Sequence, residues 1–142
     1  MRLVLDASVT MAWLVERVDA KEAKLADEVL YKVQGEEAVV PALWFSEVSN
    51  GILVAERKGG IDPSQSARFL GMVDTLPIAE DRTQSSVVQA TALRLARVYG
   101  LTGYDANYLE LVLRTGRTLA TFDQQLADAA RKAGGRVFGD PE

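Results

Sequence analysis

Short apolar runs alternate along the chain with longer segments in which apolar residues recur every three or four positions. Buried strands of a parallel sheet give the first pattern, and amphipathic helices give the second. The apolar runs predict strands at residues 3–5, 38–40, 76–79, 118–121 and 136–138.

Helix signals fill the segments between these runs. Ser8 is a candidate cap for a short helix to residue 15, and Asp19 with Glu22 resembles a capping box that opens a helix to residue 35. Asp62 before Pro63 is another start signal. Further helices are predicted at 43–58, from 62 onward, and at 83–99, 104–114 and 123–132. The alternation predicts an α/β fold with a parallel sheet, in one domain spanning residues 1–142.

Composition narrows the possible chemistry. The 142 residues include no cysteine and no histidine. This excludes disulfides, thiolate nucleophiles, iron–sulfur clusters, serine–histidine triads and the usual zinc sites. Carboxylates remain as metal ligands, and on their own they select Mg²⁺, Mn²⁺ or Ca²⁺.

Charge and hydropathy bear on location and partners. The 16 basic and 20 acidic residues give a net charge of −4, which by itself disfavours a nucleic-acid partner. Asp6 interrupts the first apolar run, so no secretory signal is expected, and the longest uncharged apolar stretch, 38–45, is too short to span a membrane. We therefore expect a cytoplasmic protein with no membrane partner.

Four acids stand where apolar residues are expected. Asp6 and Asp123 directly follow predicted strands, and ligands of open parallel sheets bind beyond the carboxyl ends of strands. Glu47 lies on a helical stripe with Trp44 and Val48, and Asp105 heads another apolar helix face. These four acids are called the acidic cluster below.

Each member also has a purely structural explanation. Asp123 is a candidate N-cap for the helix that follows it, and Asp105 is placed to form a capping box with Thr102. Glu47 is explained equally well by a salt bridge or by an edge position on its helix. Taken together, however, four converging inward acids repel one another and lose hydration, so they need a cation to neutralise them.

The sequences LDAS, WFSEVSNGIL, LTGYDANYLELVL and LATFDQQLADAA carry these acids in order along the whole chain. In this pattern the chain resembles the PIN-domain ribonucleases, and most of all the VapC-type toxins of toxin–antitoxin pairs. The resemblance implies a PIN-like three-layer α/β fold, with a central parallel sheet in order 3-2-1-4-5 flanked by helices.

The resemblance also implies the parts of an active site. Asp6, Glu47, Asp105 and Asp123 would be catalytic, with Asp6, Asp105 and Asp123 holding Mg²⁺ or Mn²⁺. Ser8 and Thr121 match hydroxyl positions beside the site, and Asn50 matches an amide position; these three are the expected supporting residues. The implied activity is metal-dependent endoribonuclease cleavage of RNA, and the implied partners are a VapB-like antitoxin and a second copy of the chain in a homodimer.

Two other enzyme classes also use acids after strands. A haloacid-dehalogenase-type phosphatase needs a second aspartate two positions after the first, where Ser8 stands. A phospho-receiver domain needs an aspartate at the end of a central strand, where the run 38–40 meets Pro41 instead. A catalytically silent PIN-like module that binds RNA or protein is the remaining alternative, but such a module has no need of four mutually repelling acids.

Some other residues have two interpretations each. Aromatics at helical spacing favour packing, in the core or at a partner interface, over base stacking, and those concerned are Trp13, Trp44, Tyr104 and Tyr108. The candidate phosphate-binding residues are Arg82, Arg94, Arg97, Arg114 and Arg117. An apolar groove for an antitoxin segment is predicted at Met11, Trp13 and Leu14.

Overall fold

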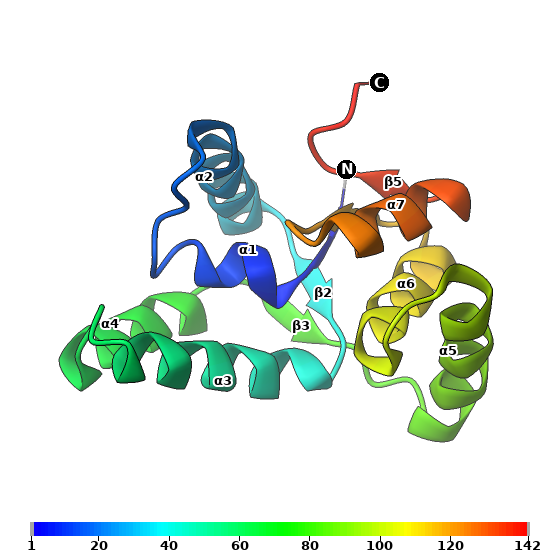
Figure 1. Ribbon diagram of the computed structural model, residues 1–142, viewed down its shortest axis with the longest axis horizontal. Coiled ribbons are helices and arrows are strands. Elements are labelled where there is room, and N and C mark those ends of the chain that lie inside the picture. Colours follow the sequence, from blue (N-terminus) through cyan, green and yellow to red (C-terminus); the bar gives the residue numbers. More distant parts are fainter. Residues whose placement is uncertain (1, 142) are drawn as a thin grey trace.

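The computed structural model describes residues 2–141, which form five strands and seven helices (Figure 1). The strands are β1 (Leu3–Leu5), β2 (Ala38–Val40), β3 (Ile78–Glu80), β4 (Thr118–Ala120) and β5 (Arg136–Val137). The helices are α1 (Ala7–Met11), α2 (Ala20–Gly35), α3 (Leu43–Arg57), α4 (Pro63–Asp74), α5 (Ser85–Tyr99), α6 (Gly103–Thr115) and α7 (Gln124–Lys132).

The strands form one parallel sheet in the order β3-β2-β1-β4-β5, which confirms the expected α/β fold and strand order. In Figure 1, α3 and α4 lie along one side of the molecule, and α5 and α6 form a helical pair at another corner. Because all strands run in the same direction, their carboxyl ends meet at one edge of the sheet.

The strands are apolar because helices cover the sheet. Every residue of β1 is buried, and so is every residue of β4, its hydrogen-bonded neighbour. Such all-round burial explains why these strands lack the alternation of a half-exposed strand. None of the helices described is long and apolar enough to cross a lipid bilayer.

Local signals predicted the start of α4 correctly and the start of α1 wrongly. Asp62 and Gln65 form the reciprocal capping box of α4, with Pro63 in the first turn as expected. The prediction that Ser8 caps the first helix was wrong, because Asp6 occupies the N-cap position and Ser8 lies inside α1. The hydroxyl of Ser8 instead donates a hydrogen bond to the Asp6 carboxylate.

Two other predicted boundaries also moved. The first helix ends at Met11 rather than at residue 15, and the third strand lies at 78–80 rather than 76–79. The strand shift follows from the sheet register, in which Ala38 faces Ile78 and Val40 faces Glu80. At Asp19 only half of the capping box forms: its carboxylate accepts from two backbone N–H groups, whereas Glu22 binds Arg17.

Candidate active site

Asp6 lies at the carboxyl end of the central strand β1. Its backbone N–H donates to the Ala120 carbonyl at 3.0 Å, so β1 and β4 stay paired up to the point where the chain turns into α1. This pairing carries Asp6 alongside Thr121, although the two residues are 115 positions apart. The Asp6 side chain is buried, with 6% exposure.

Two hydroxyl groups fix the Asp6 carboxylate. Ser8 Oγ and Thr121 Oγ1 donate to Asp6 Oδ2 at 2.6 and 2.7 Å. Each hydroxyl also accepts a backbone N–H from the turn after β4, Ser8 from Phe122 at 3.0 Å and Thr121 from Asp123 at 2.9 Å. The two predicted hydroxyl positions therefore connect the ends of β1 and β4 and orient Asp6.

Burial opposes ionisation of Asp6. Desolvation raises the pKa of its carboxyl, the hydrogen bonds from Ser8 and Thr121 counteract part of that rise, and the negative charge of Asp123 adds to it. The site therefore holds Asp6 in place while making its negative charge costly without a neighbouring cation.

Glu47, on α3, is half-buried and is oriented by a residue that sequence reasoning had assigned to packing. Tyr108 of α6 is fully buried, and its hydroxyl donates to Glu47 Oε1 at 2.6 Å. Burial raises the pKa of Glu47, the Tyr108 hydrogen bond lowers it, and the charges of Asp6 and Asp105 raise it further. The packing prediction for Tyr108 was right about its ring but missed the contact of its hydroxyl.

The Glu47–Tyr108 hydrogen bond joins residues 61 positions apart, so no local sequence pattern could predict it. A tyrosine at helical spacing in an apolar stripe indicates only that its ring is buried. The tendency of a buried phenol to find a polar partner is the one clue that pointed to an acceptor nearby.

Asp105 lies in the first turn of α6. Its backbone N–H donates to Thr102 Oγ1 at 3.1 Å, which is half of the predicted capping box. Its carboxyl is half-buried, and desolvation, followed by the charges of Asp123 and Asp6, raises its pKa to about 6. Asp105 therefore shares the electrostatic field of the other acids.

Asp123 is both a helix cap and a charge next to Asp6 and Asp105. Its Oδ1 accepts the backbone N–H of Leu126 at 2.9 Å, so the structural explanation of this residue as the cap of α7 is correct. Its negative charge also contributes to the raised pKa values of Asp6 and Asp105. Capping uses one carboxylate oxygen, which leaves the other open to a further ligand.

The structure thus brings all four acids together and leaves one supporting residue at the margin. Asn50 is exposed on α3, and its side chain contacts no member of the acidic cluster within residues 2–141. Its role remains a prediction.

The acids suit a cation by their chemistry. Carboxylates without thiolates or imidazoles are ligands for hard divalent ions. Burial and, after it, the negative charges of neighbouring acids raise the pKa values of Asp6, Glu47 and Asp105, and a bound cation would oppose both effects. Among residues 2–141, no group of three or more acidic side chains is already arranged to hold a metal ion. The residue types therefore fit Mg²⁺ or Mn²⁺, while the set of direct ligands stays a prediction.

Two of the candidate phosphate-binding arginines are engaged elsewhere. Arg114 binds Glu110 and Asp81, with shortest contacts of 2.7 and 2.6 Å. Arg117 donates to the carbonyls of Leu3 and Glu37, at the amino ends of β1 and β2 and hence away from the acids. Neither is available at the acidic cluster.

Comparisons with known proteins agree with this geometry. The PIN domain family model matches residues 3–132. Ribonuclease VapC3 of Pyrobaculum aerophilum is 30% identical over 128 residues, which cover 90% of this chain and 94% of that protein.

Solved structures give the same fold. Mycobacterium tuberculosis VapC20, a sarcin-ricin loop cleaving toxin, matches with a TM-score of 0.66 at 15% identity, over 98% of this chain and 99% of that one. A toxin–antitoxin complex from Klebsiella pneumoniae matches with a TM-score of 0.58 at 18% identity, over 87% of each chain. At these identities the structures show likeness of fold alone.

Proposed function

Because the chain belongs to the PIN-domain family, we propose that it is a VapC-type ribonuclease that hydrolyses RNA phosphodiester bonds at the acidic cluster with the help of Mg²⁺ or Mn²⁺. The observation that carries this proposal is the convergence of four carboxyl groups at the carboxyl edge of the sheet, with raised pKa values for Asp6, Glu47 and Asp105. Mutually repelling acids that the fold nevertheless holds together indicate a site built for a cation.

The contacts of each acid suggest a separate role for it in the proposed reaction. Asp6, Asp105 and Asp123 would hold the ion, with Asp6 oriented by the Ser8 and Thr121 hydroxyls. When bound, such an ion activates a water molecule for attack and stabilises the charge that develops on the leaving oxygen. Glu47, which accepts a hydrogen bond from Tyr108, would orient that water or accept its proton. In-line attack by water on the phosphorus, with cleavage of the bond to the 3′ oxygen and transfer of a proton to that oxygen, would leave a 5′-phosphate and a 3′-hydroxyl.

RNA cleavage by the purified chain tests this proposal. We expect structured RNA to be cut with Mg²⁺ or Mn²⁺, to remain intact with EDTA, and to remain largely intact with the Asp6→Asn variant. Asp27→Asn is the matched control, because Asp27 is an exposed aspartate on α2. Sequencing of the RNA ends should find 5′-phosphates. Equal cleavage in EDTA, or by Asp6→Asn, would contradict metal-dependent hydrolysis.

We further propose that this ribonuclease is the toxin of a toxin–antitoxin pair, acts in the cytoplasm and forms a homodimer. The matches to a VapC ribonuclease and to a toxin–antitoxin complex support the pairing with an antitoxin. Expression of the chain alone should arrest growth, and co-expression of an antitoxin encoded next to it should restore growth. Normal growth at high expression of the active protein would point to another role for the fold.

A further inference from the structure

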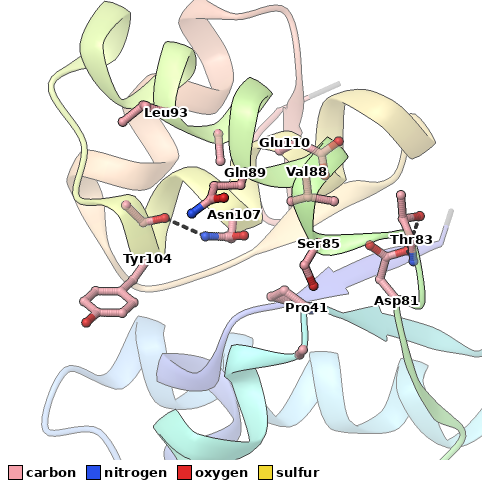
Figure 2. A pocket seen from close by; sticks show the side chains of 13 residues that line it. Pro41, Asp81, Thr83, Ser85, Val88, Gln89, Leu93, Tyr104, Asn107 and Glu110 are labelled. Atoms are coloured by element: carbon pink, nitrogen blue, oxygen red, sulfur yellow. Dashed lines mark hydrogen bonds between the residues drawn. The ribbon is translucent and has the colours of Figure 1, made fainter.

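A cavity of about 640 Å³ is bounded by α5, by α6 with its amino end, and by the segment that leads from β2 into α3 (Figure 2). We propose that this cavity is a nucleobase-binding subsite, in which a base next to the cleaved phosphodiester stacks on the ring of Tyr104. The proposal rests on the RNA cleavage proposed above and adds where the substrate is held.

The cavity and the acidic cluster share two structural elements. Gly103, Tyr104 and Asn107 line the cavity and flank Asp105 in the first turns of α6. Pro41 and Ala42 line it as well, immediately before α3, which carries Glu47. The amino ends of α3 and α6, the helices that carry Glu47 and Asp105, therefore also border the cavity, and Tyr104 is the chain neighbour of Asp105.

Tyr104 supplies an open aromatic surface. Its side chain is 69% exposed, and within the described part of the chain its ring makes neither an aromatic nor a cation–π contact. In Figure 2 it lies at one end of the cavity, with Asp81 and Thr83 at the other. Tyr104 therefore does not pack in the core, the alternative prediction of packing at a partner interface stays a prediction, and an exposed ring next to Asp105 in the chain is suited to base stacking.

Neutral polar groups line the middle of the cavity. Asn107 Nδ2 donates to the Gly103 carbonyl at 2.7 Å, which fixes the amide and leaves its Oδ1 as an acceptor. The Gln89 amide and the Ser85 hydroxyl make no hydrogen bond within residues 2–141 and are exposed on α5. Amide and hydroxyl groups match the donors and acceptors on the edge of a nucleobase.

The charges in the cavity disfavour a phosphate group. Its two charged lining residues are Asp81 and Glu110, and Arg114 binds both. Among residues 2–141, no lysine or arginine lines the cavity, so no side-chain cation there attracts an anion. A flat uncharged ring, by contrast, can contact Tyr104 and apolar side chains such as Val88. A cavity without cations but with aromatic and apolar lining is what we expect if the base lies in the cavity and the phosphate lies at the acidic cluster.

Binding of labelled single-stranded RNA to the full chain in EDTA tests the subsite without requiring cleavage. The probes are uniform oligo(U) and oligo(A), with an abasic sugar–phosphate oligomer of equal length as the base-free control. Tyr104→Ala should weaken binding of the two RNAs by about 5- to 150-fold, and Tyr104→Phe should restore it because the ring still stacks. Tyr31→Ala is the matched control, because Tyr31 is an exposed tyrosine on α2.

The abasic oligomer separates stacking from general effects. It should bind the Tyr104→Ala protein and the parent protein equally. Equal RNA affinity of the Tyr104→Ala and parent proteins, or an equal loss for RNA and the abasic oligomer, would overturn the subsite. So would a change of oligomeric state in sedimentation without a change in RNA affinity, which would make this face a protein interface. The cleavage assay described above tests metal-dependent cleavage, and the binding assay tests the base subsite. Each proposal can therefore fail without the other.

Discussion

Removal of the Asp105 charge should stabilise the metal-free protein above pH 6. The pKa of Asp105 is raised from 3.8 to about 6, chiefly by burial and then by the charges of Asp123 and Asp6. A carboxyl with a higher pKa in the folded state binds its proton more tightly there than in the unfolded state. Its ionisation therefore lowers the free energy of unfolding as pH rises from about 4 to about 6, and the full loss persists above that range.

The size of the effect follows from the shift. At about 1.4 kcal/mol per pKa unit, a rise from 3.8 to about 6 corresponds to at most about 3 kcal/mol. Asp105 is only half-buried, and screening by solvent reduces this to about 1–2 kcal/mol. Asp105 also interacts favourably with the amino end of the α6 dipole. Loss of that interaction in the variant offsets about 0.3–1 kcal/mol of the expected stabilisation. Asp105→Asn should therefore stabilise the metal-free protein by about 1 kcal/mol.

Urea unfolding in EDTA measures this difference. The gain should be present well above pH 6 and absent at or below the ordinary aspartate pKa of 3.8, where the native carboxyl is also neutral. Added Mn²⁺ should then reverse the order, since an ion that binds only the folded state at one hundred times its Kd stabilises it by about 2.7 kcal/mol. Asp27→Asn controls for removal of an exposed aspartate charge. A variant that is less stable than the parent at high pH in EDTA would refute the repulsion argument.

Three other substitutions test separate contacts of the site. Tyr108→Phe removes the hydroxyl that donates to Glu47. It should lower the free energy of unfolding in urea by about 1.5–3 kcal/mol, and it should also lower metal-dependent activity; no change in either quantity would mean that the contact contributes to neither. Asp123→Asn keeps the cap, since asparagine caps as well as aspartate, and should lower the pKa of Asp105 in an NMR titration; an unchanged titration would remove Asp123 from the cluster. Gly51→Ala places a methyl group 2.8 Å from the sulfur of Met11 on α1, so this flexible side chain must move; because alanine also favours the helix by about 1 kcal/mol over glycine, the melting temperature should change little, and a large drop would show that Met11 is held in place.

The fold was largely predictable because its signals are local. Apolar runs, the Asp62–Pro63 start and the glycines that end helices act within a few residues of one another, and Gly100 and Gly116 do take the left-handed conformation, with φ of 66° and 70°. The order of the strands came from the resemblance, because pairing between distant segments leaves no trace in a local pattern.

Long-range contacts account for most of what sequence reasoning missed. The Tyr108 hydroxyl on Glu47 and the Arg114 contact with Asp81 both join residues far apart in the chain. The error at Ser8 was local instead. Its hydroxyl was expected to cap backbone N–H groups, but it donates to the stronger acceptor, a carboxylate two positions earlier.

The contact between Asp6 and Thr121 also bears on the synthesis of the protein. Asp6 is made first, and Thr121, which orients it, and Asp123, which belongs to the same acidic cluster, follow more than a hundred residues later. A chain still being translated therefore has no complete acidic cluster until Asp123 has been made. In a ribonuclease, this order delays assembly of the proposed active site until synthesis has passed that residue.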